Sequence, residues 1–228
     1  MSSAAHTVAP DTFPRYATEE EYLRLDAEAP HGVKYEYLFG RIYTWNGEPN
    51  AMAGGRPEHS HIGFKVARAL DDRITGNCIV FNSDLQVQTE RTVAFPHNYV
   101  YPDVSLACDP KFDGVRLTNP ILLVEVLSDS TARKDTHHKV AAYFTIPSVQ
   151  EYWVFAQDMA QVIQYYRSNE GISLLTTTGR QQQIAAITPA LRALGLDQPI
   201  QLEDVYAFAL RDEEEGSGPP TTDDRGES

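Results

Sequence analysis

The sequence predicts an α/β fold, or a related α+β sandwich, in which helices flank one central mixed β-sheet. Residues 119–128 (NPILLVEVLS) are apolar almost throughout, which is typical of a strand in a sheet covered on both faces. Residues 59–74 carry apolar side chains at helical spacing, on one face of an expected helix. Strand-like and helix-like segments follow one another along the chain, so the two kinds of element should pack in layers around one core.

The first half of the chain begins with an expected helix near residues 18–27. Thr18 followed by Glu21 is a capping-box pattern that makes Thr18 the N-cap. Residues 34–45 are aromatic and β-branched around Gly40, which indicates a hairpin that turns at this glycine. Pro102 lies within an expected strand, where it should mark a sheet edge or a distortion. The other segments are a Gly/Pro loop over 52–59 and strands over 77–83, 84–89 and 99–108.

The second half continues the alternation after the apolar strand. A helix is expected over 130–146, with Ser130 or Thr131 near its start and Pro147 beyond its end. Residues 200–210 predict a strand that leads into a short helix. Further strands are expected over 149–157, 161–167 and 171–178.

Length and composition suit one domain. We expect it over residues 16–211, between an N-terminal tail at 1–15 and a disordered acidic tail at 212–228. The formal net charge of −13 counts against a large nucleic-acid footprint. Cys78 and Cys108 match no zinc-ligand spacing, so both are expected as reduced thiols that fill the core. No signal peptide or spanning apolar run is recognisable, and the protein is therefore expected to be cytoplasmic.

The residues that could carry chemistry lie between Asp103 and Lys139. Asp103 belongs to one strand-like run, and Glu125 lies inside the apolar strand that follows. A carboxylate in an apolar strand is costly unless it is paired or bound to a metal. Carboxylates on neighbouring strands offer the hard oxygen ligands that Mg²⁺ prefers. Lys139, on the following helix, could return its ammonium group to the sheet edge, with Asp135 and Tyr143 one turn away on the same face.

Each of these residues also has a structural interpretation. A Pro-Asp pair most often forms a turn, a buried glutamate can belong to an ion pair, and a helical lysine usually faces solvent. Trp45, Trp153 and the tyrosines are expected in the core or on the sheet rather than as base-stacking platforms. The functional interpretation therefore rests on the ordered set of residues and not on any one of them.

Several motifs occur in a fixed order along the chain. They are E-x-x-x-G at 36–40, a loop that ends at His59, PD at 102–103, EVLS-x-ST at 125–131, D-x-x-x-K-x-x-x-Y at 135–143 and IPS-x-x-EYW at 146–153. In this order they resemble the Uma-two family of restriction-endonuclease-like proteins, a bacterial branch of the PD-(D/E)xK nuclease superfamily. The resemblance covers roughly residues 16–206, and Asp129 departs from it by replacing the commoner proline.

The resemblance implies a restriction-endonuclease-like core and a site built on it. Asp103 and Glu125 would hold Mg²⁺ or Mn²⁺. Lys139 would replace the superfamily's strand lysine, because Leu127 stands at that position here. Glu36 would be an auxiliary catalytic acid close to the metal.

Two further residues are assigned to substrate binding: His59, which would border the site, and Tyr143. A homodimer is expected by analogy with the superfamily.

Together these features predict a metal-dependent endonuclease that hydrolyses phosphodiester bonds in DNA by a metal-activated water. One alternative is a non-catalytic module on the same scaffold that binds nucleic acid or protein. Another is a nuclease that acts on RNA or on a structured intermediate.

Overall fold

The computed structural model describes residues 15–44, 56–127 and 132–210. The expected tails fall outside these ranges, apart from Arg15, and so do Ser130 and Thr131 at the expected start of a helix. Within the described ranges, no helix combines the length and the hydropathy that a membrane-spanning helix requires.

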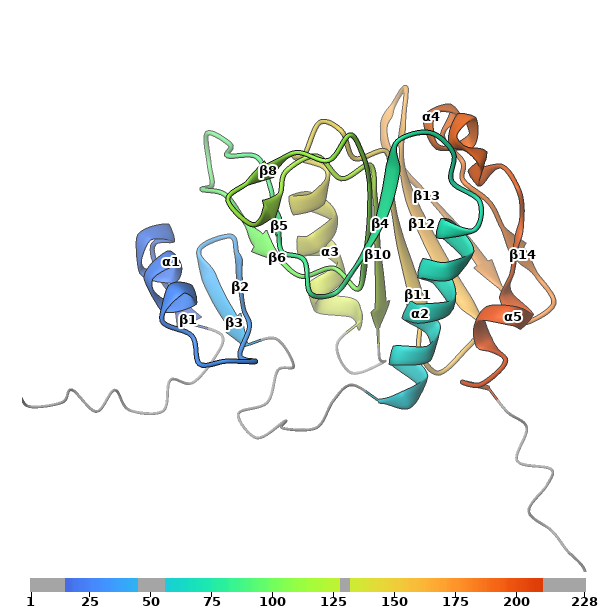
Figure 1. Ribbon diagram of the computed structural model, residues 1–228, viewed down its shortest axis with the longest axis horizontal. Helices are drawn as coiled ribbons and strands as arrows, with labels where there is room; N and C mark the ends of the chain where they lie inside the picture. Colours follow the sequence, from blue (N-terminus) through green and yellow to red (C-terminus); the bar gives the residue numbers. More distant parts are fainter. Residues whose placement is uncertain (1–14, 45–55, 128–131, 211–228) are drawn as a thin grey trace, which may run out of the picture.

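A six-stranded mixed sheet occupies the centre of the domain (Figure 1). Its order is β13 (Gly171–Thr178), β12 (Gln161–Ser168), β11 (Glu151–Ala156), β10 (Leu122–Leu127), β7 (Val104–Cys108) and β4 (Cys78–Asn82). The apolar strand β10 pairs in parallel with β11 and antiparallel with β7. Leu122 and Val124 belong to one buried cluster and Leu123 to another. The prediction that this strand is covered on both faces is therefore confirmed.

The prediction of one central sheet was wrong, because a second large sheet stands beside the first. Proline has no N–H to donate to a ladder, and Pro102 divides the expected strand over 99–108 into two strands that join different sheets. The second sheet has the order β1 (Arg15–Tyr16), β3 (Arg41–Thr44), β2 (Tyr35–Leu38), β6 (Tyr99–Val100), β5 (Val87–Gln88), β9 (Arg116–Leu117) and β8 (Phe112–Asp113). A small third sheet pairs β14 (Gln183–Ile184) with β15 (Ile200–Gln201).

The local signals of the first forty residues are confirmed. Helix α1 (Glu19–Ala27) begins after Thr18, whose backbone N–H donates to Glu21 Oε2 at 2.7 Å. The backbone N–H of Glu21 donates in return to Thr18 Oγ1. The β2–β3 hairpin turns at Phe39 and Gly40, both with positive φ, as a tight two-residue turn requires. This hairpin carries Glu36 toward the six-stranded sheet.

Helices cover the two faces of the six-stranded sheet (Figure 1). Helix α2 (Pro57–Asp71) buries Ile62, Val66 and Leu70 on the face that includes Val124. It begins at Pro57, earlier than expected, because proline suits the first turn of a helix. Helix α3 (Ala132–Tyr143) packs on the opposite face, together with the second sheet. The remaining helical segments are α4 (Pro189–Leu191), the π-helical turn η1 (Arg192–Leu196) and α5 (Leu202–Tyr206).

The segment around α4 was not predicted, and a buried carboxylate holds it in place. Glu151 is fully buried at the start of β11. Its carboxylate accepts hydrogen bonds from the Trp153 indole at 2.7 Å, from the backbone N–H groups of Ile187 and Thr188, and from the Thr188 hydroxyl. Satisfied in this way, a buried carboxylate stabilises a fold. The EYW motif is therefore structural.

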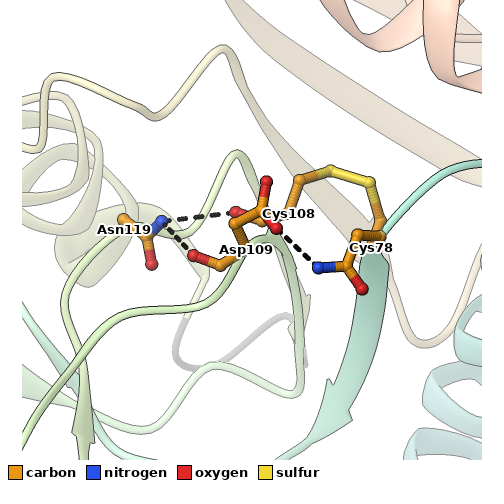
Figure 2. The surroundings of a disulfide bond; sticks show 5 residues. Cys78, Cys108, Asp109 and Asn119 are labelled. Carbon is orange, nitrogen blue, oxygen red and sulfur yellow. Dashed lines mark hydrogen bonds between the residues drawn. A yellow bond between two sulfur atoms is a disulfide. The ribbon is translucent and has the colours of Figure 1, made fainter.

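The two cysteines form a disulfide, so the prediction of two separate reduced thiols was wrong (Figure 2). Cys78 and Cys108 are 30 residues apart in sequence, but they lie directly opposite each other on the antiparallel strands β4 and β7. The Asn119 side-chain amide donates to the backbone carbonyls of Cys108 and Asp109 beside this bond. Sequence spacing could not show this pairing, because it depends on the strand order.

We expect reduction of the disulfide to lower the free energy of unfolding by about 2–4 kcal/mol, because the unfolded chain regains the freedom of an open loop. Guanidinium unfolding with and without reductant measures this difference. The double variant Cys78→Ser/Cys108→Ser should unfold equally in both conditions. Two reactive thiols in the denatured, unreduced wild type would contradict the pairing.

Candidate functional site

Asp103 lies just before β7, beside Glu125 in the neighbouring strand β10. Val104 pairs with Val124 across β7 and β10, so Asp103 stands beside Glu125 one position further along. The backbone N–H of Val126 donates to Asp103 Oδ2 at 2.7 Å and fixes that carboxylate against β10. Both acids line one cavity of about 430 Å³. The structure thus brings together the two carboxylates that the sequence singled out, although their binding of a metal remains a prediction.

Lys139 reaches this pair from α3. Its ammonium nitrogen donates to Glu125 Oε1 at 2.7 Å and lies 3.5 Å from Glu36 Oε1. The side chain is only 13% exposed, so the lysine faces the site and not bulk solvent. Glu36 also accepts the backbone N–H of Tyr101 at 2.8 Å. The hairpin, the sheet and helix α3 therefore each contribute one charged group to a single cluster.

Tyr143 contacts this cluster from helix α3. Its hydroxyl donates to Glu125 Oε1 at 2.6 Å, and its side chain is fully buried against Tyr152. This hydrogen bond holds the Glu125 carboxylate in position. Contact of Tyr143 with a substrate, expected from the sequence, stays a prediction. The side chain of Asp135, expected to orient Lys139, lies outside the described part of the chain.

His59 borders the cavity from the first turn of α2, as predicted. Its Nε2 lies 3.2 Å from Asp103 Oδ1, and the ring is partly exposed to the cavity. Burial lowers the pKa of His59, against the raising effect of the Glu125 charge. The imidazole is therefore neutral at neutral pH and can donate one hydrogen bond to Asp103. Its contact with a substrate remains a prediction.

Burial sets the charge state of the cluster. It raises the pKa of Asp103 to about 6, although the Val126 N–H and Lys139 oppose the rise. It raises the pKa of Glu125 and of Glu36, and Lys139 opposes both shifts. Burial alone would lower the pKa of Lys139. The negative charges of Glu125 and Glu36 have the larger combined effect, so the pKa of the lysine is raised. Lys139 is accordingly an ammonium ion that cannot act as a base near neutral pH.

The donor set fits a hard divalent cation that keeps part of its water shell. In the described ranges, no group of three or more His, Cys, Asp or Glu side chains is arranged to hold a metal. Mg²⁺, however, is commonly held by one or two carboxylates, with water and substrate phosphate as its other ligands. Both hydrogen bonds that Glu125 accepts from described residues fall on Oε1. Glu125 Oε2 and the Asp103 carboxylate are therefore the oxygens that could hold the ion.

Sequence reasoning missed the rest of the cavity wall. Besides the carboxylates, His59 and Val126, the wall includes Asn82 at the end of β4, Ser83 after it, and the α2 residues Ser60, Gly63, Phe64 and Ala67. The available signal was the i, i+4 spacing of His59, Gly63 and Ala67, which puts these residues on one stripe of the helix.

Comparison with known protein families gives one assignment for this chain. Residues 19–199 match the model of the Uma2 family, described as "Putative restriction endonuclease". The chain belongs to the Uma2 family. The resemblance noted from the ordered motifs is thereby confirmed for most of the domain, including every residue of the cluster around Glu125.

Two uncharacterized relatives and one solved structure are also similar to this chain. The chain is 34% identical over 162 residues to the uncharacterized protein slr1290 of Synechocystis sp., covering 70% of this chain and 78% of that protein. It is 33% identical over 164 residues to sll1609 of the same organism, covering 70% of this chain and 85% of that protein. A crystal structure from Anabaena variabilis, titled as "a putative nuclease belonging to DUF820", shares the fold with a TM-score of 0.61 at 14% identity. The match covers 84% of this chain and 98% of that one.

The raised pKa of Asp103 predicts that its ionised carboxylate lowers the free energy of unfolding, and that this effect depends on pH. The folded state holds this proton more tightly than the unfolded chain, whose value is near 3.8. The contribution of Asp103 to the free energy of unfolding is therefore greatest below about pH 4, and it falls as the pH rises to about 6. Asp103→Asn keeps an acceptor for Val126 and removes the charge. Without metal, we expect it to be more stable than the wild type by up to about 3 kcal/mol near neutral pH, and not near pH 4.

Chemical denaturation in the presence of a chelator measures this difference at each pH. An advantage of Asp103→Asn that stays constant between acid and neutral pH would contradict the raised pKa.

Proposed function

We propose that this Uma2 protein is a metal-dependent endonuclease that hydrolyses phosphodiester bonds in DNA. The observation that carries the proposal is that Asp103 and Glu125 line one cavity, while Lys139 from helix α3 donates a hydrogen bond to Glu125. Mg²⁺ or Mn²⁺ is the proposed cofactor, and a homodimer on a restriction-endonuclease-like core is the proposed form. A cation bound there would polarise a phosphoryl oxygen and lower the pKa of a water molecule.

The protein's own groups divide the remaining work. Asp103 and Glu125 would hold the cation, and the Val126 N–H and the Tyr143 hydroxyl keep their carboxylates oriented. Lys139 is a fixed positive charge beside Glu125, where it can stabilise the negative charge that develops on the attacked phosphate.

Glu36 completes the arrangement from the hairpin. Its carboxylate and that of Glu125 both contact the Lys139 ammonium group and so fix this group in place. We propose that Glu36 is a positioning residue. In place of a direct part in catalysis, the auxiliary acid expected from the sequence would orient Lys139.

Glu125→Gln should abolish metal-dependent cleavage, with a loss of at least about a thousandfold, because the variant lacks a charged ligand. Cleavage of plasmid and oligonucleotide DNA in Mn²⁺ is the direct measurement, and titration calorimetry with Mn²⁺ reports binding. Glu203→Gln, an exposed change on α5, is the matched control and should leave both unchanged.

Cleavage that survives Glu125→Gln would overturn the proposed site. A second outcome favours the non-catalytic module, which the net charge of −13 supports. In that case the wild type would cut neither DNA nor RNA, and its Mn²⁺ heat would not depend on Glu125.

Lys139→Met should separate catalysis from metal binding. We expect cleavage to fall at least about a hundredfold, because a charge-stabilising donor is lost. Metal affinity should increase, because the variant leaves Glu125 and Glu36 without their counter-ion. Thermal unfolding with and without Mn²⁺ measures this, and the metal should raise the Tm of Lys139→Met more than that of the wild type. Loss of both cleavage and Mn²⁺ binding would show that Lys139 serves only to hold the fold.

A further inference from the structure

Helix α2 has a second face besides the one that packs on the sheet. Ile62, Val66 and Leu70 point into the core and are fully buried. His59, Gly63 and Ala67 form a neighbouring stripe at i, i+4 spacing and line the cavity, with Ser60 and Phe64 on its outer side. This stripe faces the same space as Asp103 and Glu125. The cavity therefore has an acidic end and a wall formed by a helix.

Gly63 keeps that wall open. A glycine inside a helix is about 1 kcal/mol less favourable than alanine, so its presence here needs a reason. Its φ is not positive, and a Cβ built on it would meet no atom within 4 Å. Neither backbone strain nor tight packing explains the glycine. Its effect is to leave free volume in the cavity beside the carboxylates.

Phe64 exposes an aromatic ring to this volume. Its side chain is 62% exposed, although it lies on a well-formed helix next to the core. Phe95 and Phe112 are also exposed, but each contacts another ring, Phe39 and Phe81 respectively. In the part of the chain that the structure describes, Phe64 stacks on no other ring. An aromatic face that is open to solvent is suited to stacking on a flat ligand.

We propose that Phe64 and Gly63 form a nucleobase subsite, and that the substrate is an unpaired nucleotide within single-stranded DNA. This rests on the proposed function, because a cation held by Asp103 and Glu125 in the same cavity would engage the phosphate. The group attached next to a phosphate in a polynucleotide is a sugar with its base, and the base is the flat part that an aromatic ring can stack on.

A base inside a duplex has both faces covered by its neighbours, so it cannot reach Phe64 without leaving the stack. The single strand is therefore the form that fits the cavity. The charge of the protein agrees with this choice. A chain with a net charge of −13 gains little from phosphate contacts, whereas stacking contributes affinity that does not depend on charge.

The test measures binding separately from cleavage. The full chain is titrated with an end-labelled oligodeoxythymidylate in Ca²⁺, and fluorescence anisotropy reports the dissociation constant. We expect Phe64→Ala to weaken binding about tenfold and Phe64→Trp to restore it. Gly63→Leu, which fills the free volume, should weaken it to a similar extent. Phe112→Ala is the matched control and should bind like the wild type, because it removes an exposed aromatic ring outside the cavity.

The outcomes separate this inference from the proposed function. Equal affinity of Phe64→Ala and the wild type, or tighter binding of duplex than of single strand, overturns the subsite. If Glu125→Gln still abolishes cleavage in that case, the nuclease proposal stands alone. If single-strand binding depends on Phe64 but no metal-dependent cleavage occurs, the subsite stands and the nuclease proposal fails. Absence of any binding to the oligonucleotide overturns the subsite.

Discussion

The candidate site depends on one interaction, the ion pair between the buried Glu125 carboxylate and the Lys139 ammonium group. A carboxylate in the central strand of a covered sheet is unfavourable unless charge and hydrogen bonds compensate its loss of water. Lys139 supplies the charge, and Tyr143 supplies a hydroxyl to the same oxygen. Since Lys139 also lies close to Glu36, this pair joins helix α3 to the hairpin and to the six-stranded sheet.

The second requirement is a break in the chain at Pro102. The segment before it pairs in one sheet and the segment after it pairs in the other. Asp103 therefore lies at a junction, where its side chain is not committed to either apolar cluster and can accept hydrogen bonds from Val126 and His59. The same proline that interrupts the ladder places the Asp103 carboxylate in the wall of the cavity. In this protein, an irregularity of the backbone creates the site.

Much of this was readable from the sequence, because some features depend on local chemistry alone. The capping box at Thr18, the turn at Gly40 and the apolar run around Glu125 need only nearby residues to form. The grouping of Asp103, Glu125 and Lys139 was also expected, since the ordered motifs carry it. What failed depended on partners distant in sequence.

The division into two large sheets and the Cys78–Cys108 bond both follow from which strands become neighbours. No spacing along the chain shows that. The lesson of Glu151 is different. It belongs to a motif that helps identify the family, yet its four hydrogen bonds anchor the segment before α4 and contact no group of the site. A recognisable motif can thus mark a fold rather than a reaction.

The disulfide lies at the opposite end of the strand pair β4–β7 from the cavity. Cys78 begins β4 and Cys108 ends β7, whereas Asn82 and Asp103 lie at the other end. A slip of one residue between paired strands would turn every side chain of β7 to the other face, Asp103 among them. The disulfide prevents that slip and so fixes the register between β4 and β7. Where the bond is reduced, backbone hydrogen bonds and packing alone must keep Asp103 on the side of Glu125.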